Sequence, residues 1–252
     1  MNKEFLSKYA TLRSLNLGQA EKDYYQNLIL FVLYGKISKD LIFKGGTALS
    51  RCYGLNRFSE DLDFTISTEQ DFISIVGKGL DDFEIKNTIR RLRMDEQGSK
   101  YKIKIEGPLF SGSEKTLCNI TLDFSKREDI LLPPAIVTIG YHMDIIPTFD
   151  VCAMSESEIL AEKIRAIMTR ESARDLYDIV FLVRKNISAD QKTIAKKLEF
   201  YHLGFEVKTF LRRVRTLKVI WKSELSSLVK NVPDFDEYVE VVDNWVNSDS
   251  LK

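Results

Sequence analysis

The sequence predicts an α+β protein in two parts. A small mixed sheet with flanking helices is expected over residues 1–152, followed by a helical domain over residues 153–252. Short segments that alternate polar and apolar residues are typical of strands, and they fade after about residue 152. Helical periodicity dominates from there on, and a Ser-x-x-Glu capping box at Ser155 and Glu158 opens the first of these helices.

The elements expected in the first part follow from hydrophobic periodicity and from turn residues. Residues 3–35 have apolar positions at helical spacing, which predicts helical structure. The strands expected are residues 41–43, 61–66, 101–106, 118–124 and 135–141. A short helix is expected at residues 47–53, and a helix with a basic face (Lys86, Arg90, Arg91, Arg93) at residues 82–94.

Composition excludes several classes of protein. Lys and Arg together number 37, as do Asp and Glu, so net charge predicts no partner and an anion must be bound by a local patch or through metal ions. Three cysteines without a CxxC pair argue against a disulfide framework, and two histidines against a zinc site. With no secretory signal, and no apolar run near the roughly 20 residues that span a bilayer, we expect a cytoplasmic protein without a membrane partner.

Asp61 and Asp63 are the first candidate site residues. In a strand, alternate side chains share a face, so the two carboxylates lie on one face about 6.6 Å apart along the strand, at a rise of ~3.3 Å per residue. Carboxylates so close repel each other, and one or two divalent cations would relieve the repulsion. Such an arrangement suits phosphoryl or nucleotidyl transfer. The alternative is a pair of aspartates that face water from an edge strand.

The turn at Gly45, Gly46 and Thr47 precedes this strand. Two glycines let the main chain approach a phosphate, with N–H groups exposed at the start of a helix. The Thr47 hydroxyl adds a donor for a phosphate oxygen. The turn is not a P-loop, because no Gly-Lys-Ser/Thr follows at the required spacing. The alternative is an ordinary Gly-Gly turn.

Asp123 is a third candidate carboxylate. In the strand expected at residues 118–124 it lies on the polar face, opposite an apolar face. That position suits a metal ligand or a general base. The alternative is an aspartate at the end of a strand that precedes a turn.

Lys163 lies within the apolar stripe of the helix that begins near Glu156, four residues from both Ile159 and Ile167. A lysine on a buried face needs an anionic partner, such as a triphosphate, or a route by which its ammonium reaches water. Asp178 also lies on a core-facing stripe. Its i, i+4 spacing from Arg174 suits a plain helix salt bridge, and the alternative is a role in orienting Lys163 or an acceptor hydroxyl.

A basic run in the second half contains Lys208, Arg212, Arg213, Arg215, Lys218 and Lys222. Such a run is able to follow an RNA backbone, but a solvated amphipathic face is favoured, with the acidic residues 234–243 balancing it.

Two blocks of residues together resemble the AbiEii-type nucleotidyltransferases, a family of bacterial toxins. The first comprises residues 45–49 (Gly-Gly-Thr-Ala-Leu) and 57–64 (Arg-Phe-Ser-Glu-Asp-Leu-Asp-Phe). The second comprises residues 162–166 (Glu-Lys-Ile-Arg-Ala), Arg170 and residues 174–178 (Arg-Asp-Leu-Tyr-Asp). The blocks bracket about half of the chain, and their combination is more specific than either block alone.

The resemblance implies a DNA polymerase β-like nucleotidyltransferase domain followed by a helical domain. It places the triphosphate at Gly46 and Thr47, within the turn that Gly45 opens, and Mg²⁺ at Asp61 and Asp63, with Mn²⁺ as the alternative ion. The superfamily usually has Gly-Ser where this chain has a threonine, which preserves the hydroxyl.

Three further roles follow from the resemblance. Lys163 would bind phosphate. Asp178 would be the catalytic acidic residue that comes late in the sequence. Asp123 matches the superfamily's third carboxylate, a metal ligand, by strand context only.

The resemblance also implies the reaction. Such toxins are usually encoded beside an antitoxin, and some add nucleotides from an NTP to the tRNA 3′ end. We therefore expect transfer of NMP from an NTP to an acceptor hydroxyl, with RNA, most simply tRNA, as acceptor and a cognate antitoxin as partner. The alternatives are a nucleotidyltransferase that modifies a protein hydroxyl and a catalytically silent nucleotide-binding module.

Overall fold

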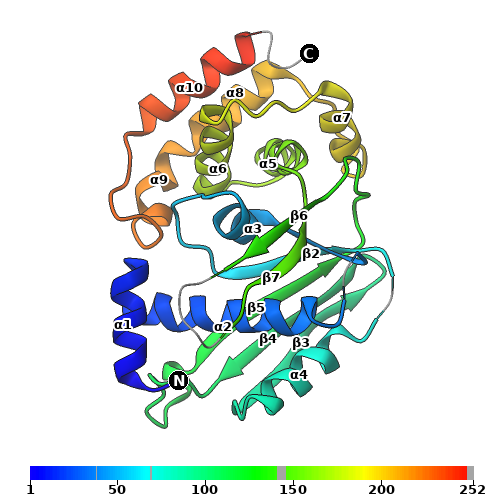
Figure 1. Cartoon of the computed structure of the whole chain (residues 1–252). Helices are drawn as coiled ribbons and strands as arrows, with labels where there is room; N and C mark the ends of the chain where they lie inside the picture. The colour runs from blue at the N-terminus through cyan, green and yellow to red at the C-terminus, as the bar shows by residue number, and fades with distance from the viewer. Residues whose placement is uncertain (38, 69, 141–145, 249–252) are drawn as a thin grey trace. The chain divides into compact units, whose positions relative to one another are not determined.

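The computed structural model describes residues 1–37, 39–68, 70–140 and 146–248 (Figure 1). The chain divides into two compact units, each built from separate segments. Unit 1 comprises residues 1–48, 60–127 and 136–153, and unit 2 comprises residues 49–59, 128–135 and 154–252. Among the described helices, none is long and apolar enough to cross a membrane.

The sheet of unit 1 is mixed, as the sequence predicts. Its seven described strands follow the order β3-β4-β5-β2-β1-β7-β6. They are β1 (Leu41–Lys44), β2 (Asp61–Ile66), β3 (Asn87–Asp95), β4 (Gly98–Ile105), β5 (Cys118–Ser125), β6 (Ala135–Ile139) and β7 (Phe149–Ala153). The β2–β5 and β1–β7 pairs are parallel, whereas β1–β2, β3–β4 and β4–β5 are antiparallel.

One face of this sheet carries the core of unit 1. Leu62 and Phe64 of β2 and Leu122 and Phe124 of β5 have no exposed surface. The Phe124 ring stacks on Phe64 at 5.3 Å and on Phe72 at 4.8 Å between ring centroids. Burying each such side chain contributes about 1.5–3 kcal/mol. The residues between them are half-buried, so the opposite face of these strands is polar.

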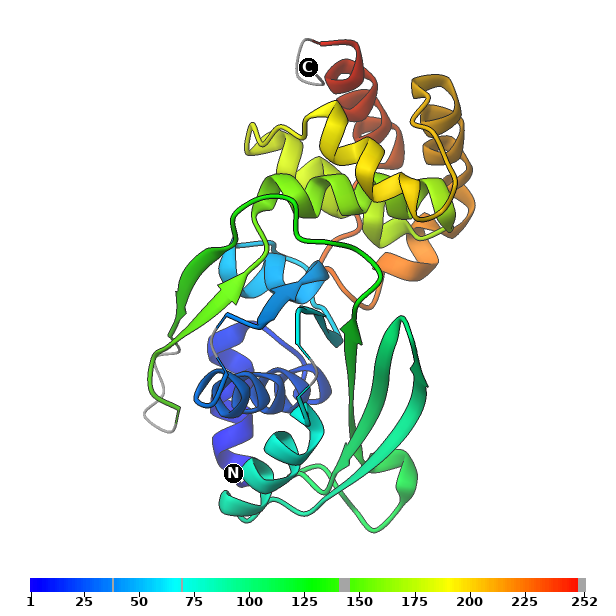
Figure 2. The same ribbon diagram turned by 90° about the vertical axis from the view of Figure 1, so that its right-hand side faces the viewer.

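Helices cover the apolar face. The helical segment expected at residues 3–35 consists of α1 (Lys3–Arg13) and α2 (Leu17–Tyr34). The break occurs because Ser14 adopts a left-handed φ of 53° and Asn16 starts α2 with a capping box. α2 contacts β5 and β7, and α4 (Phe72–Asp82) contacts β3. Figure 2 shows these blue and teal helices to the left of the long teal and green strands.

The helix expected at residues 82–94 is wrong. α4 ends at Asp82, and residues 87–95 form β3, which pairs along its length with β4. A turn fixes this hairpin: the Gln97 N–H donates to the Asp95 carboxylate, and Gly98 has a φ of 129°. A Cβ at Gly98 would lie 2.0 Å from the Phe124 main-chain oxygen, so the close approach of β4 to β5 requires glycine.

The remaining expectations are largely confirmed. Strands occur at all five predicted places, and the predicted short helix is α3 (Gly45–Cys52), which begins two residues earlier than expected. Residues 135–139 form β6, while Tyr141 lies outside the described residues. The strand β7 was not expected.

Unit 2 is helical, as predicted for the second half. Its helices are α5 (Glu156–Thr169), α6 (Ala173–Arg184), α7 (Gln191–Glu199), α8 (Val207–Thr216), α9 (Lys218–Leu225) and α10 (Phe235–Asn247). Leu160, Ile164 and Leu176 are among the residues with no exposed surface in its core. The three cysteines of the chain are free thiols, and burial raises the pKa of the Cys52 thiol to about 12.

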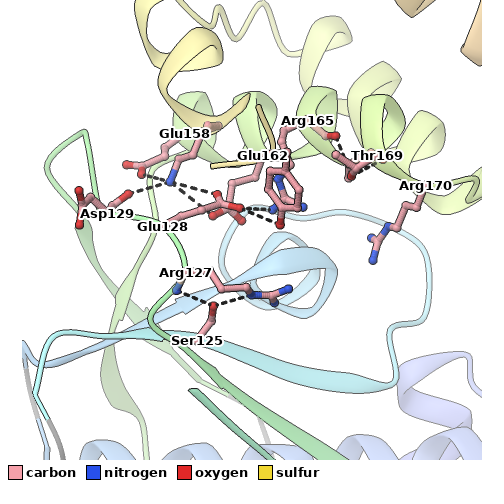
Figure 3. Close-up of polar contacts among 12 residues, drawn as sticks. Ser125, Arg127, Glu128, Asp129, Glu158, Glu162, Arg165, Thr169 and Arg170 are labelled. Atoms are coloured by element: carbon pink, nitrogen blue, oxygen red, sulfur yellow. Dashed lines mark hydrogen bonds and ion pairs between the residues drawn. The ribbon is translucent and has the colours of Figure 1, made fainter. Parts of the chain in front are cut away.

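A buried lysine joins α7 to α5 and to residues 128–135. Lys197 is 1% exposed, and its ammonium lies 2.7 Å from Glu158, 3.5 Å from Glu162 and 3.7 Å from Glu128. Figure 3 shows these three glutamates converging. Burial lowers the pKa of Lys197, but attraction to Glu162 and then to Glu158 and Glu128 outweighs burial, so the pKa is raised.

This cluster changes the expected capping box. The Ser155 hydroxyl accepts the Glu158 N–H, as predicted. The Glu158 carboxylate does not complete the box, because it accepts hydrogen bonds from the main-chain N–H groups of Leu131 and Leu132 at 2.9 Å each. Glu158 therefore attaches the segment 128–135 to α5.

We predict that Lys197→Met destabilises unit 2, because it leaves three buried carboxylates without their shared cation. Removing one partner of a buried ion pair typically costs about 3–5 kcal/mol. Urea unfolding followed by circular dichroism would measure the change. Lys196→Met is the matched control, since Lys196 is exposed and pairs with the exposed Glu199 one turn away. Equal unfolding midpoints for the two variants would contradict the prediction.

Candidate active site

Asp61 and Asp63 lie on the polar face of β2. Both are half-buried, whereas Leu62 and Phe64 point into the core on the other face. The alternation predicted from the sequence is therefore confirmed. The two carboxylates share a face with a Cα separation of about 6.6 Å, at ~3.3 Å per residue.

The strand registers extend this polar face across the sheet. Asp63 pairs with Asp123 of β5 on one side and with Lys44 of β1 on the other. Asp123 pairs in turn with Lys100 of β4. Because directly paired residues point to the same face, Asp123 lies beside Asp63, as the hypothesis of a third carboxylate requires.

The start of α3 lies against these carboxylates. Gly45 follows β1 directly, and its φ of 75° is in the region that favours glycine. A Cβ at Gly45 would lie 2.7 Å from Oδ2 of Asp63. The first N–H groups of a helix have no partner within the helix. Gly45 therefore brings the anion-attracting end of α3 next to Asp63.

Thr47 has a different partner from the one expected. Its hydroxyl donates to the main-chain oxygen of Asp61, and Thr47 is buried. A threonine has one O–H proton, so this bond uses the donor that was expected to bind phosphate. In this arrangement Thr47 connects α3 to β2 and fixes the position of Asp61.

Asp61 and Asp63 fit a magnesium site. Mg²⁺ is commonly held by one or two carboxylates together with substrate phosphates, and both aspartates offer hard oxygen donors on one face. Within the described ranges, no group of three acidic, histidine or cysteine side chains is already gathered around a metal position.

Asp123 is engaged by two cations. Nη2 of Arg93 and Nζ of Lys100 each lie 3.5 Å from its carboxylate oxygens. These are long contacts, and the Arg93 and Lys100 side chains are about one-third exposed. To act as a metal ligand or a base, Asp123 would exchange these cations for another partner.

The second block of the sequence forms a buried ion network within unit 2. Nζ of Lys163 lies 2.8 Å from Asp175 and 2.7 Å from Asp178. Arg57 contacts Asp178 through two parallel bonds of 2.6 and 2.7 Å. Arg170 makes a similar paired contact with Asp175 at 2.9 and 3.1 Å. Two-point contacts of this kind are strong and fix orientation.

This network answers two questions that the sequence left open. Lys163 neither reaches water nor lacks an anion, because Asp175 and Asp178 are its partners. Asp178 pairs with Arg57 and Lys163 and not with Arg174, since it faces the core from α6. No role was expected for Arg57, although the residue belongs to the first block of the resemblance.

The network shifts the pKa values of its carboxyl groups. Burial raises the pKa of Asp178, but Arg57 and then Lys163 outweigh burial and hold that pKa below its usual range. In the same way Lys163 and then Arg170 outweigh burial at Asp175 and lower its pKa. Both carboxylates are therefore charged at neutral pH.

The basic run of the second half lies on α8 and α9. Arg215 pairs with Asp243, and Lys218 pairs with Asp236, both on α10. The acidic residues 234–243 thus balance part of the run, as expected. Lys208 and Arg212 are exposed.

We predict that unit 2 is sensitive to acid through Asp175 and Asp178. A carboxyl group whose pKa is lowered by folding stabilises the fold above its unfolded pKa of ~3.9, and that stability is lost as pH falls toward the folded pKa. Stability should therefore decline below about pH 5. Asp178→Asn should weaken this dependence and lower stability at neutral pH, as measured by urea unfolding at several pH values. Asp236→Asn, in an exposed pair, should change neither, and a neutral-pH stability unaffected by Asp178→Asn would refute the role of the network.

Comparisons with known proteins agree with the fold. MenT4, a nucleotidyltransferase toxin from Mycobacterium tuberculosis, superposes with a TM-score of 0.69 at 18% identity, covering 99% of this chain and 91% of that chain. JHP933 from Helicobacter pylori superposes with a TM-score of 0.61 at 20% identity, covering 89% of this chain and 88% of that chain. At such identities the likeness shows a shared fold.

Sequence comparison assigns the family. No match is found among curated proteins. A family model described as "Nucleotidyl transferase AbiEii toxin, Type IV TA system" matches residues 32–241, which is most of the chain. The chain therefore belongs to the AbiEii family, the nucleotidyltransferase toxins of type IV toxin–antitoxin systems.

Proposed function

We propose that this nucleotidyltransferase moves NMP from an NTP to the hydroxyl at a tRNA 3′ end, with Mg²⁺ held by Asp61 and Asp63. The contact between Gly45 and Asp63 is the observation that carries this proposal. It supports a site in which main-chain N–H groups at the start of α3 bind a phosphate beside the metal-binding carboxylates. Mn²⁺ offers the same oxygen-ligand chemistry.

The chemistry divides between the ion and the chain. When bound, Mg²⁺ neutralises charge on the triphosphate and lowers the pKa of the attacking hydroxyl. Asp61 and Asp63 hold the ion from β2, and Thr47 keeps Asp61 in place. The acceptor oxygen forms a bond to the α-phosphorus, the bond to the β-phosphate breaks, and pyrophosphate leaves. Asp123 serves as the third metal ligand or accepts the proton of the acceptor hydroxyl.

The proposed roles of Lys163 and Asp178 carry a condition. For Lys163 to bind phosphate, its ammonium must leave Asp175 and Asp178, to which it is held at 2.7–2.8 Å. For Asp178 to act as a catalytic acidic residue, it must break its two hydrogen bonds with Arg57.

The toxin would act inside the cell that makes it, and its partner would be a cognate antitoxin that restrains the transfer.

We predict that Asp63→Asn abolishes transfer of label from NTP to tRNA without unfolding the protein. Losing a metal-binding carboxylate should lower the rate at least a hundredfold, roughly the scale of lost electrostatic stabilisation in such sites. The assay would offer each labelled NTP with Mg²⁺ and total tRNA. Glu60→Gln is the matched control, because Glu60 is exposed and pairs with Lys22.

Three results would count against the proposal. Label on a protein, with none on RNA, would favour the protein-modifying reaction. NTP binding with no transfer to RNA or protein would favour the silent module. Full activity in Asp63→Asn would show that the chemistry lies elsewhere.

We predict that Gly45→Ala abolishes transfer even where the protein folds, because its methyl group would occupy space beside the Asp63 carboxylate. Gly54→Ala is the matched control. Gly54 has a similar φ of 85°, but an added Cβ meets nothing within 4 Å. Both variants should lose about 1 kcal/mol or more of stability from the strained main chain. Only Gly45→Ala should lose activity, and equal activity in the two would refute the close approach.

A further inference from the structure

The polar face of the β3–β4 hairpin carries five cations, here called the cation face. They are Arg90, Arg93, Lys100, Lys102 and Lys104. Arg93 is directly paired with Lys100, and Arg90 with Lys102, so both pairs point to the same face. The β-bulge between Arg91 and Arg93 brings Arg93 into register with Lys100.

The cation face continues the face that holds the carboxylates. Asp61 pairs with Thr121, and Thr121 pairs with Lys102, which pairs with Arg90. Neighbouring strands lie about 4.8 Å apart, so the Cα atom of Lys102 is roughly 10 Å from that of Asp61. All of these residues belong to unit 1.

The cations differ in what they contact. Arg93 and Lys100 share Asp123, and Lys104 pairs with Glu114. In the part of the chain that the structure describes, Arg90 and Lys102 form no ion pair. Arg90 is exposed and Lys102 is half-exposed.

This arrangement has an energetic cost that an anion would offset. Like charges directly opposite each other destabilise a pair of strands. Of the two such pairs here, Arg93 and Lys100 share Asp123 as a counter-charge, whereas Arg90 and Lys102 share none among the described residues. The face is longer than one triphosphate needs, because it runs across two strands and along three alternate positions of β4. A chain of phosphates matches both its charge and its extent.

We propose that the cation face binds the phosphate backbone of the RNA acceptor and leads its 3′ end to Asp61 and Asp63. The inference rests on the proposed function, since it assumes that the acceptor is RNA. Contacts to phosphate carry no base information, so the face sets position and affinity but not sequence preference.

Binding of labelled tRNA without NTP tests the proposal, by fluorescence anisotropy over a range of salt concentrations. The double variant Arg90→Gln/Lys102→Gln should weaken binding about tenfold and lower the salt slope by about 1.4, at ~0.7 per phosphate contact of a single strand. Thermal unfolding of this variant should be unchanged or raised, because the repulsion between Arg90 and Lys102 is removed.

The matched control is Lys208→Gln/Arg212→Gln, which removes two exposed cations from α8 of unit 2. Its affinity and salt slope should equal those of the wild type. An equal loss of tRNA affinity in both variants, or a loss in the control alone, would overturn the proposal that the cation face binds the RNA backbone. The proposed transfer to RNA would then still stand. A wild-type protein that transfers label to tRNA yet binds it with no salt dependence would also overturn it. Failure of the wild type both to bind and to label tRNA would overturn the proposed function as well.

Discussion

The burial of Leu62 and Phe64 decides which way Asp61 and Asp63 face. Alternate residues of a strand point to opposite sides, so a shift of one residue in β2 would bury both carboxylates and expose both apolar side chains. The stacked rings of Phe64, Phe124 and Phe72 oppose that shift. The same packing fixes β5 beside β2. The position of Asp123 next to Asp63 is therefore a consequence of core packing and requires no contact between the two aspartates.

Unit 2 meets a different constraint, which is the cost of burying charge. Arg57, Lys163, Asp175 and Asp178 are nearly inaccessible to solvent, and each is neutralised by an opposite charge. Such a network holds its members in one arrangement, because moving any one leaves another buried charge unpaired. Lys163 and Asp178 therefore fit a role in holding α5 against α6 at least as well as direct contact with substrate.

The local features of the site could be predicted from the sequence, and the long-range ones could not. The alternation around Asp61 and Asp63 and the Gly-Gly turn are visible within a few residues. The Arg57–Asp178 contact joins residues 121 positions apart, and no local pattern indicates it. The prediction of a helix at β3 failed for another reason. Arg90 and Arg93 are three residues apart, a spacing that places two residues on one face of a helix. In β3 they also share one face, because the bulge between Arg91 and Arg93 shifts the register of the strand by one residue. Tertiary pairing decides between the two.

A chain with no net charge still presents a strongly charged face, because folding separates charges that are mixed along the sequence. In β4 the lysines alternate with Tyr101 and Ile103, so the pleat gathers them on one side. The pairing of β4 with β3 then places Arg90 and Arg93 beside these lysines on the same face. On α8 and α9, part of the basic run is balanced, since α10 supplies Asp236 and Asp243 to Lys218 and Arg215. Of the two basic stretches in the sequence, the one on β3 and β4 shares a sheet face with the carboxylates, and its paired cations Arg90 and Lys102 form no ion pair among the described residues. The equal numbers of acidic and basic residues therefore do not argue against a polyanionic acceptor.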